Sequence, residues 1–187
     1  MSIALILIDI QNDYFPGGRM ELVNSLEAAG AAARLLACFR KASWPVYHVQ
    51  HISAQTTATF FLPGTPGIDI HQGVSPIEGE TVITKHYPNS FRETDLLERL
   101  KADGIDQLLI CGMMTSRCVD ATVRAAFDLG FTCTVAKDAC ATRDLMLDGE
   151  TVPARQVQIA FLSPLSAVYA KIRTTDAIIE GIAACTA

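Results

Sequence analysis

The sequence lacks the features of several protein classes. Only 19% of its 187 residues are charged and 7% are aromatic, whereas 50% are hydrophobic and the mean hydropathy is +0.27. This balance excludes intrinsic disorder. No apolar run approaches the ~20 residues that a membrane-spanning helix needs, since the longest, such as Ile3–Ile8 and Leu108–Cys111, have the length of a strand. The length predicts one domain, residues 1–187, around a single core.

An excess of positive charge is also missing. The 15 Lys and Arg residues are outnumbered by 20 Asp and Glu residues, for a net charge of −5. This charge argues against nucleic acid or an anionic membrane as a partner. The N-terminus enters an apolar run without the basic start and small-residue cleavage site of a secretory signal. We therefore expect a cytoplasmic protein.

The cysteines form no CxxC pair, so a zinc site or a thioredoxin-like motif gets no support. There are six of them: Cys38, Cys111, Cys118, Cys133, Cys140 and Cys185. Without an export signal we expect reduced thiols, and Cys38, Cys111 and Cys133 lie inside apolar patterns as small hydrophobic residues do. Cys118 does not fit this description and is considered below.

Short β-rich runs alternate with helix-length segments along the chain. Expected strands cover Ala4–Ile10, Val46–His51, Thr81–Lys85, Gln107–Gly112, Phe131–Ala136 and Ala167–Ala170, and expected helices cover Ser25–Ala42, Thr94–Ala102, Arg117–Leu129, Pro153–Phe161 and Thr175–Ala184. Apolar strands separated by helices indicate a parallel sheet covered on both faces. The predicted fold class is α/β, with three layers, and the irregular segment Ile52–Gly79 is interpreted as a pocket wall or subunit contact.

Three reactive side chains follow the predicted strands. Asp9 ends the first strand, Lys85 ends the third, and Cys118 comes just after the fourth. Ligands of an open parallel sheet bind outside the carboxyl ends of its strands, so this coincidence predicts a site. Each residue alone has an ordinary alternative: a turn cap for Asp9, a solvated lysine, and a buried core thiol or redox-sensing thiol for Cys118.

These residue types can perform nucleophilic chemistry together. Thr115 or Ser116 can cap a helix that begins around Arg117, which would put Cys118 in a first turn whose N–H groups and dipole favour a thiolate. Asp9, alone in an apolar run, could accept the thiol proton. If the three residues converge, a lysine at position 85 would keep the carboxylate charged and stabilise the thiolate.

The blocks LILIDIQNDYFPGG, VITKHYPNSF and LLICGMMTSRCVDATVRAAFDLGF resemble the isochorismatase-like cysteine hydrolase superfamily, and they come in that family's order. The resemblance implies a six-stranded, mostly parallel sheet. It also implies a catalytic triad, with Cys118 as nucleophile, Asp9 as acid and base and Lys85 as assisting cation. A cis peptide between Met113 and Met114 is implied as well, aiming the N–H groups of Met114 and Cys118 at one point as an oxyanion hole.

The superfamily includes nicotinamidases, N-carbamoylsarcosine amidases, ureidoacrylate amidohydrolases, streptothricin hydrolases and isochorismatases. The resemblance thus implies hydrolysis of a C–N bond (amide, carbamoyl or ureido) of a small molecule through a thioester. Vinyl-ether cleavage of the isochorismatase type needs no cysteine nucleophile, so Cys118 favours C–N hydrolysis. An ether hydrolase and a non-catalytic, redox-sensing relative stay as alternatives. Family members commonly form dimers or tetramers, and we expect a homo-oligomer.

One family feature is in doubt, because nicotinamidases hold a metal ion through an aspartate and two histidines after the second strand. Here Gln50 stands about where that aspartate is expected. His48 and His51, three apart on a strand, would point to opposite faces, which is poor geometry for chelation. We therefore predict no metal and no cofactor.

Residues near the three blocks are candidates for substrate binding, with ordinary packing as the alternative. Phe15 follows the DIQNDY block and would lie beside Asp9. Phe61, Tyr87 and Phe91 could supply aromatic walls, and Asn89 could supply a polar contact.

Overall fold

The computed structural model describes residues 2–186, with side chains up to residue 183. Six strands form one parallel sheet in the order β3-β2-β1-β4-β5-β8. Their bounds are β1 (Ile3–Ile8), β2 (Val46–His51), β3 (Thr81–Lys85), β4 (Gln107–Met113), β5 (Thr132–Ala141) and β8 (Ala170–Arg173).

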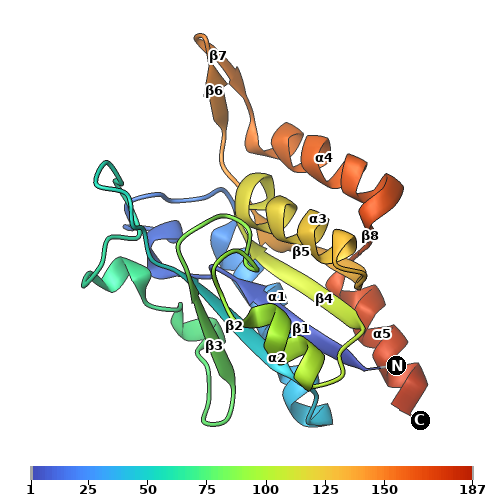
Figure 1. Cartoon of the computed structure of the whole chain (residues 1–187). Helices are drawn as coiled ribbons and strands as arrows, with labels where there is room; N and C mark the ends of the chain where they lie inside the picture. The colour runs from blue at the N-terminus through green and yellow to red at the C-terminus, as the bar shows by residue number, and fades with distance from the viewer. Residues whose placement is uncertain (1, 187) are drawn as a thin grey trace.

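Helices cover both faces of this sheet. They are α1 (Ser25–Ala42), α2 (Leu96–Ala102), α3 (Asp120–Asp128), α4 (Ala154–Pro164) and α5 (Thr175–Thr186). In Figure 1, α1 and α5 lie behind the sheet, whereas α2 and α3 lie in front of it. The inner stripe of α1 runs through Ala28, Ala32, Leu35 and Phe39, whose spacing matches the helical repeat. The predicted three-layer fold is confirmed.

The central strand β1 is buried along residues 4–8 and ends next to the site. Residues 4–8 are all buried, because β2 and β4 flank the strand and helices cover both of its faces. Such a strand has a continuous apolar sequence without alternation. The first charged residue of the chain, Asp9, therefore follows directly at the strand's carboxyl end.

Several predicted bounds have to be corrected. The first strand ends at Ile8 and not at Ile10, and the fifth runs on to Ala141. The last strand is not Ala167–Ala170: Leu165–Tyr169 forms a π-helical turn, and strand β8 begins only at Ala170. This edge strand is at most half-buried, so its apolar pattern is weak. The helix expected from Arg117 begins earlier, with a π-helical turn over Thr115–Val119 that runs into α3.

A hairpin that the sequence analysis missed projects from the body of the molecule (Figure 1). It consists of β6 (Leu145–Leu147) and β7 (Glu150–Val152), paired antiparallel in a sheet of their own. Asp148 and Gly149 connect them with positive φ angles of 52° and 83°. An Asp-Gly pair is a strong sequence signal for this type of turn. The side chains of Met146 and Leu147 are largely exposed on the hairpin.

Across residues 2–186, each helix is too short or too polar to cross a lipid bilayer.

Candidate active site

The order of the strands brings the predicted site residues to one edge of the sheet. Strand β1, which ends before Asp9, lies between β2 and β4, and Cys118 follows the end of β4. Lys85 ends β3 and lies in register with His51, the last residue of β2. Residues that are 33 or more positions apart in the sequence thus become neighbours.

Asp9 and Lys85 form a buried ion pair. The Lys85 Nζ atom lies 2.8 Å from Asp9 Oδ2, and neither side chain is exposed. Nζ also donates hydrogen bonds to the backbone oxygens of Tyr87 (3.1 Å) and Pro88 (3.3 Å). Burial lowers the pKa of Lys85, but the charge of Asp9 and the contacts with Asp9 and Cys118 raise it above the ordinary value. The ammonium therefore stays charged in the site.

The turn-cap alternative for Asp9 does not describe this arrangement. The backbone N–H of Gln11 bonds to the backbone oxygen of Asp9 (2.9 Å), while the carboxylate faces Lys85. Among the described residues, neither carboxylate oxygen of Asp9 has a partner with full hydrogen-bond geometry; Oδ2 has the ion-pair contact with Lys85, and Oδ1 has none. One carboxylate oxygen is thus free to exchange a proton.

Cys118 lies against this pair and is 4% exposed. Its sulfur, a carboxylate oxygen of Asp9 and a ring nitrogen of His51 all lie within 4.8 Å of one another. Burial raises the pKa of the Cys118 thiol, Asp9 raises it further, and Lys85 opposes both. The expectation that the helix start favours a resting thiolate is therefore wrong, because burial outweighs the stabilisation. The resting group is a neutral thiol next to a carboxylate.

The loop that carries Cys118 is tied to strand β5. Thr115 Oγ1 donates a hydrogen bond to the backbone oxygen of Ala141 (3.2 Å), and Ser116 Oγ bonds to Thr142 Oγ1 (2.9 Å). Neither hydroxyl caps the helix, so that expectation is wrong as well. The peptide bond between Met113 and Met114 is cis in this structure.

Gly112 fixes how closely β1 and β4 approach each other at the site. Its φ angle is +131°, and a Cβ atom there would lie 2.0 Å from the backbone oxygen of Ile8. Only glycine fits this position without a shift of the backbone. The close approach sets the spacing between Asp9, just beyond β1, and Cys118, just beyond β4.

The sequence analysis missed His51 as a site residue. Its Nδ1 atom lies 3.1 Å from Lys85 Nζ and 3.8 Å from Asp9 Oδ2. Burial lowers the pKa of His51 to about 4; Lys85 and His86 lower it as well, and Asp9 opposes them. The ring is therefore neutral at ordinary pH. A signal was present in the sequence, because a strand's last residue faces the site when its neighbouring strands end there.

Tyr14 is a second residue that the sequence analysis missed. The short 3-10 helix Asn12–Tyr14 turns its ring inward, 4.6 Å from the ring of Phe61. Burial raises the pKa of Tyr14, and the neighbouring Cys118 and Asp9 groups add to this rise. Tyr14 therefore belongs to the surroundings of the thiol.

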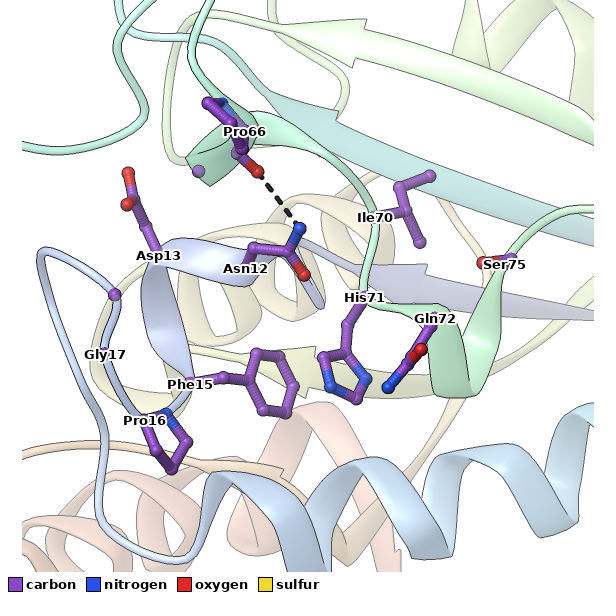
Figure 2. A pocket seen from close by; sticks show the side chains of 12 residues that line it. Asn12, Asp13, Phe15, Pro16, Gly17, Pro66, Ile70, His71, Gln72 and Ser75 are labelled. Carbon is purple, nitrogen blue, oxygen red and sulfur yellow. Dashed lines mark hydrogen bonds between the residues drawn. The ribbon is translucent and has the colours of Figure 1, made fainter.

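Among the expected lining residues, Phe61 lies next to the site. Its ring centroid is 5.7 Å from that of His51, and its backbone N–H donates to Asp13 Oδ2 (2.6 Å). Part of segment 52–79 thus forms a wall beside the cluster of Asp9, His51 and Cys118. Phe15 instead stacks on His71 at 3.8 Å and lines a pocket of about 510 Å³ whose lining includes none of the triad (Figure 2).

The three remaining candidates make packing contacts. The Tyr87 ring lies under the guanidinium of Arg92 at 3.6 Å, and only its backbone oxygen reaches Lys85. Asn89 Oδ1 accepts a hydrogen bond from the backbone N–H of Phe91 (2.9 Å), and Phe91 stacks on Phe131 at 6.1 Å.

A metal ion does not fit the donor atoms of the site. Within the described part of the chain, only Asp9, His51 and Cys118 form a group of the kind that holds an ion. The Lys85 ammonium already contacts two of them, so a cation occupies the cluster. Gln50 donates to the backbone oxygen of Ile68 (2.9 Å) and offers no carboxylate.

The family model for the isochorismatase domain matches residues 3–175. The chain therefore belongs to the isochorismatase family, and it is a hydrolase.

Three similar proteins illustrate this relationship. YddQ of Bacillus subtilis, an uncharacterized isochorismatase family protein, is 51% identical over 180 residues, which cover 96% of this chain and all of that protein. A crystal structure assigned to the isochorismatase hydrolases, from Oleispira antarctica, is 50% identical, with a TM-score of 0.91 and 96% of both chains covered. A streptothricin hydrolase of Streptomyces noursei is 34% identical over 161 residues, covering 81% of this chain and 55% of that enzyme.

Proposed function

We propose that the protein is a cysteine-dependent hydrolase that cleaves a C–N bond of a small amide, carbamoyl or ureido compound through a thioester. The observation that carries this proposal is the meeting of a thiol, a carboxylate and an ammonium in one buried cluster. A carboxylate with a free oxygen beside a neutral thiol is suited to remove its proton as the sulfur attacks.

The first half of the reaction forms the thioester. Asp9 takes the proton from Cys118, and the sulfur bonds to the carbonyl carbon of the substrate. The backbone N–H groups of Met114 and Cys118 are the proposed oxyanion hole, and Lys85 keeps Asp9 charged until it accepts the proton. The protonated Asp9 then gives its proton to the leaving nitrogen, the C–N bond breaks, and the amine departs.

The second half releases the acid. Asp9, again a carboxylate, takes a proton from water, and the resulting hydroxide adds to the thioester carbon. The C–S bond breaks, and the thiolate of Cys118 takes back the proton from Asp9. The products are one carboxylic or carbamic acid and one amine or ammonia, and the site returns to its starting state.

Named activities of relatives support hydrolysis of this kind. Besides the streptothricin hydrolase, a maleamate amidohydrolase of Pseudomonas putida is 27% identical over 154 residues, 75% of this chain and 72% of that enzyme. Vinyl-ether cleavage of the isochorismatase type is the second candidate, favoured by the family's name but needing no nucleophilic sulfur. The cytoplasm, where a thiol stays reduced, is the proposed location.

We also infer a homo-oligomer, a dimer or a tetramer. The exposed Met146 and Leu147 on the projecting hairpin support self-association, because large apolar side chains favour contact with another surface. Light scattering across a range of protein concentrations measures the mass directly.

A substrate screen with active-site variants tests the chemistry. Primary amides, carbamoyl amines and ureido compounds are assayed for release of ammonia or amine, and isochorismate is assayed for pyruvate. Cys118→Ala should abolish amide turnover while far-UV circular dichroism is unchanged, and Cys38→Ala, a half-buried cysteine on α1, is the matched control. Turnover that survives in Cys118→Ala would refute the nucleophile, and activity on isochorismate alone would favour the ether reaction.

A further inference from the structure

His51 is the part of the cluster that reaches the outside. Its side chain is 16% exposed, whereas those of Asp9 and Lys85 are completely buried. A ring nitrogen of His51 lies within 4.8 Å of the Cys118 sulfur, so a group bound at the sulfur comes close to the imidazole ring.

The contact with Lys85 determines which ring nitrogen carries the proton. A lysine ammonium has no lone pair, so the His51 Nδ1 atom 3.1 Å away can only accept, and it shares the three ammonium protons with Asp9 and the two backbone oxygens. The ring is neutral, so its single proton lies on Nε2. The ion pair with Asp9 and the bonds to the Tyr87 and Pro88 oxygens keep the ammonium in place. The structure thus holds a donor group, Nε2–H, in a fixed tautomer.

The surroundings of the ring keep this state over a wide pH range. The charged and titratable groups around it are Asp9, Lys85, Cys118 and His86, and Phe61 supplies an apolar wall at 5.7 Å. Asp9 favours a second proton on His51, but Lys85 occupies the nitrogen that would receive it. His51 can therefore act as a neutral hydrogen-bond donor, without the long-range attraction of a cation.

We propose that His51 is a specificity residue whose Nε2–H binds a second acceptor oxygen of the substrate, two bonds from the carbon that Cys118 attacks and distinct from the oxygen in the proposed oxyanion hole. This inference rests on the proposed function of Cys118 as nucleophile. The substrate class is narrowed to small molecules with a carbonyl, amide or carboxylate oxygen beside the reacting carbon. Compounds that lack such an oxygen leave the donor without a partner and bind less well.

Two alkylating agents of similar size separate binding by His51 from reactivity of the sulfur. Iodoacetamide carries a carbonyl oxygen two bonds from the carbon that the sulfur attacks, and allyl iodide carries none. The rate constant for alkylation of Cys118 is measured for each agent by mass spectrometry of the peptide that contains it. In the wild type, the contact predicts a preference for iodoacetamide beyond that shown by a free thiol.

Two variants divide the functions of the imidazole. His51→Asn keeps an acceptor oxygen near the position of Nδ1 but lacks Nε2–H, and the rate with iodoacetamide should fall about tenfold, with that of allyl iodide unchanged within about twofold. His51→Gln can place an amide N–H near the position of Nε2 and should recover most of the rate with iodoacetamide. His71→Asn, a histidine outside the triad cluster, is the matched control.

The outcomes separate the possible roles. A selective loss with iodoacetamide, rescued by glutamine, supports the contact. Equal losses with both agents in folded variants would show that His51 acts on the sulfur through Lys85, and unchanged rates would show no role; either result overturns the proposal. If neither agent modifies Cys118 in the wild type, the nucleophile itself is wrong and the specificity role falls with it.

Discussion

Strand β2 carries two histidines, three positions apart, that belong to two different buried clusters. On one face, His48 Nε2 lies 2.8 Å from Glu80, and Arg40 of α1 donates two further hydrogen bonds to that carboxylate, at 2.7 and 2.8 Å. On the other face, His51 belongs to the cluster of Asp9, Lys85 and Cys118. Both clusters place a carboxylate beside a cation and a histidine.

The two carboxylates differ in how completely they are satisfied. Glu80 accepts from Arg40, His48 and the backbone N–H of Ile77, and these bonds, against the opposing effect of burial, lower its pKa to about 2. Asp9 keeps an oxygen without a donor among the described residues. A fully bonded carboxylate stabilises the fold, whereas one with a free oxygen beside a thiol can exchange protons.

The largest expected effect comes from removing the cation of the reactive cluster. In Lys85→Met, Asp9 is left buried without its partner, and kcat/KM should fall by a factor on the order of 10³ or more. The unfolding free energy should also fall, by about 3–5 kcal/mol. Steady-state kinetics and urea unfolding measure the two effects. Turnover within tenfold of the wild type would show that the ammonium is not needed.

A smaller effect, on stability alone, is expected at the satisfied cluster. Glu80→Gln removes the charge that Arg40 and His48 contact, and the side chain is only 10% exposed. Unfolding free energy should fall by about 2–3 kcal/mol, with kcat/KM within twofold of the wild type. A large loss of activity would contradict the assignment of the Glu80 cluster to stability and the Asp9 cluster to proton exchange.

The same cluster predicts a pH dependence. Because the pKa of Glu80 is about 2 in the folded protein and 4.5 otherwise, its contribution is complete above about pH 4.5 and is lost as the pH falls towards 2. The stability difference between wild type and Glu80→Gln should therefore narrow from pH 6 to pH 2. Urea midpoints at four pH values measure it, and a constant difference would mean that the carboxylate's charge contributes nothing.

The smallest loss of unfolding free energy is expected for an ion pair that is exposed to solvent. Arg99 and Asp95 lie four residues apart at the start of α2, with Nε 2.7 Å from Oδ2 and both side chains about half exposed. Arg99→Ala should lower the unfolding free energy by about 0.3–0.5 kcal/mol, because water screens the pair. Thermal unfolding in low and high salt measures this loss, and a loss as large as that of Glu80→Gln would remove the distinction between buried and exposed charges.

Much of the fold follows from local sequence. The bounds of α1, β2 and β3 agree with prediction, because periodic apolar positions or a continuous apolar run mark them clearly. The last strand could not be placed, since an edge strand with half-buried residues has no such pattern. The hairpin was missed although Asp148-Gly149 signals it, because its strands are too short to stand out.

Only those site residues whose position follows from the end of a strand could be predicted from the sequence. Asp9, Lys85 and Cys118 converge because the sheet order brings their strands together. His51 was considered only as a metal ligand, so its register with Lys85 went unnoticed. Tyr14 and Phe15 are adjacent in sequence, and which of them turns inward depends on the 3-10 helix, whose geometry the sequence does not reveal.

Gly112 has a consequence for how this enzyme could be redesigned. Because the backbones of β1 and β4 meet closely at Gly112, the spacing between Asp9 and Cys118 depends little on the side chains around the site. The wall beside these residues comes from segment 52–79, whose Phe61 ring contacts the rings of Tyr14 and His51. Diversifying this stretch offers a route to new selectivity in which the reacting atoms keep their positions.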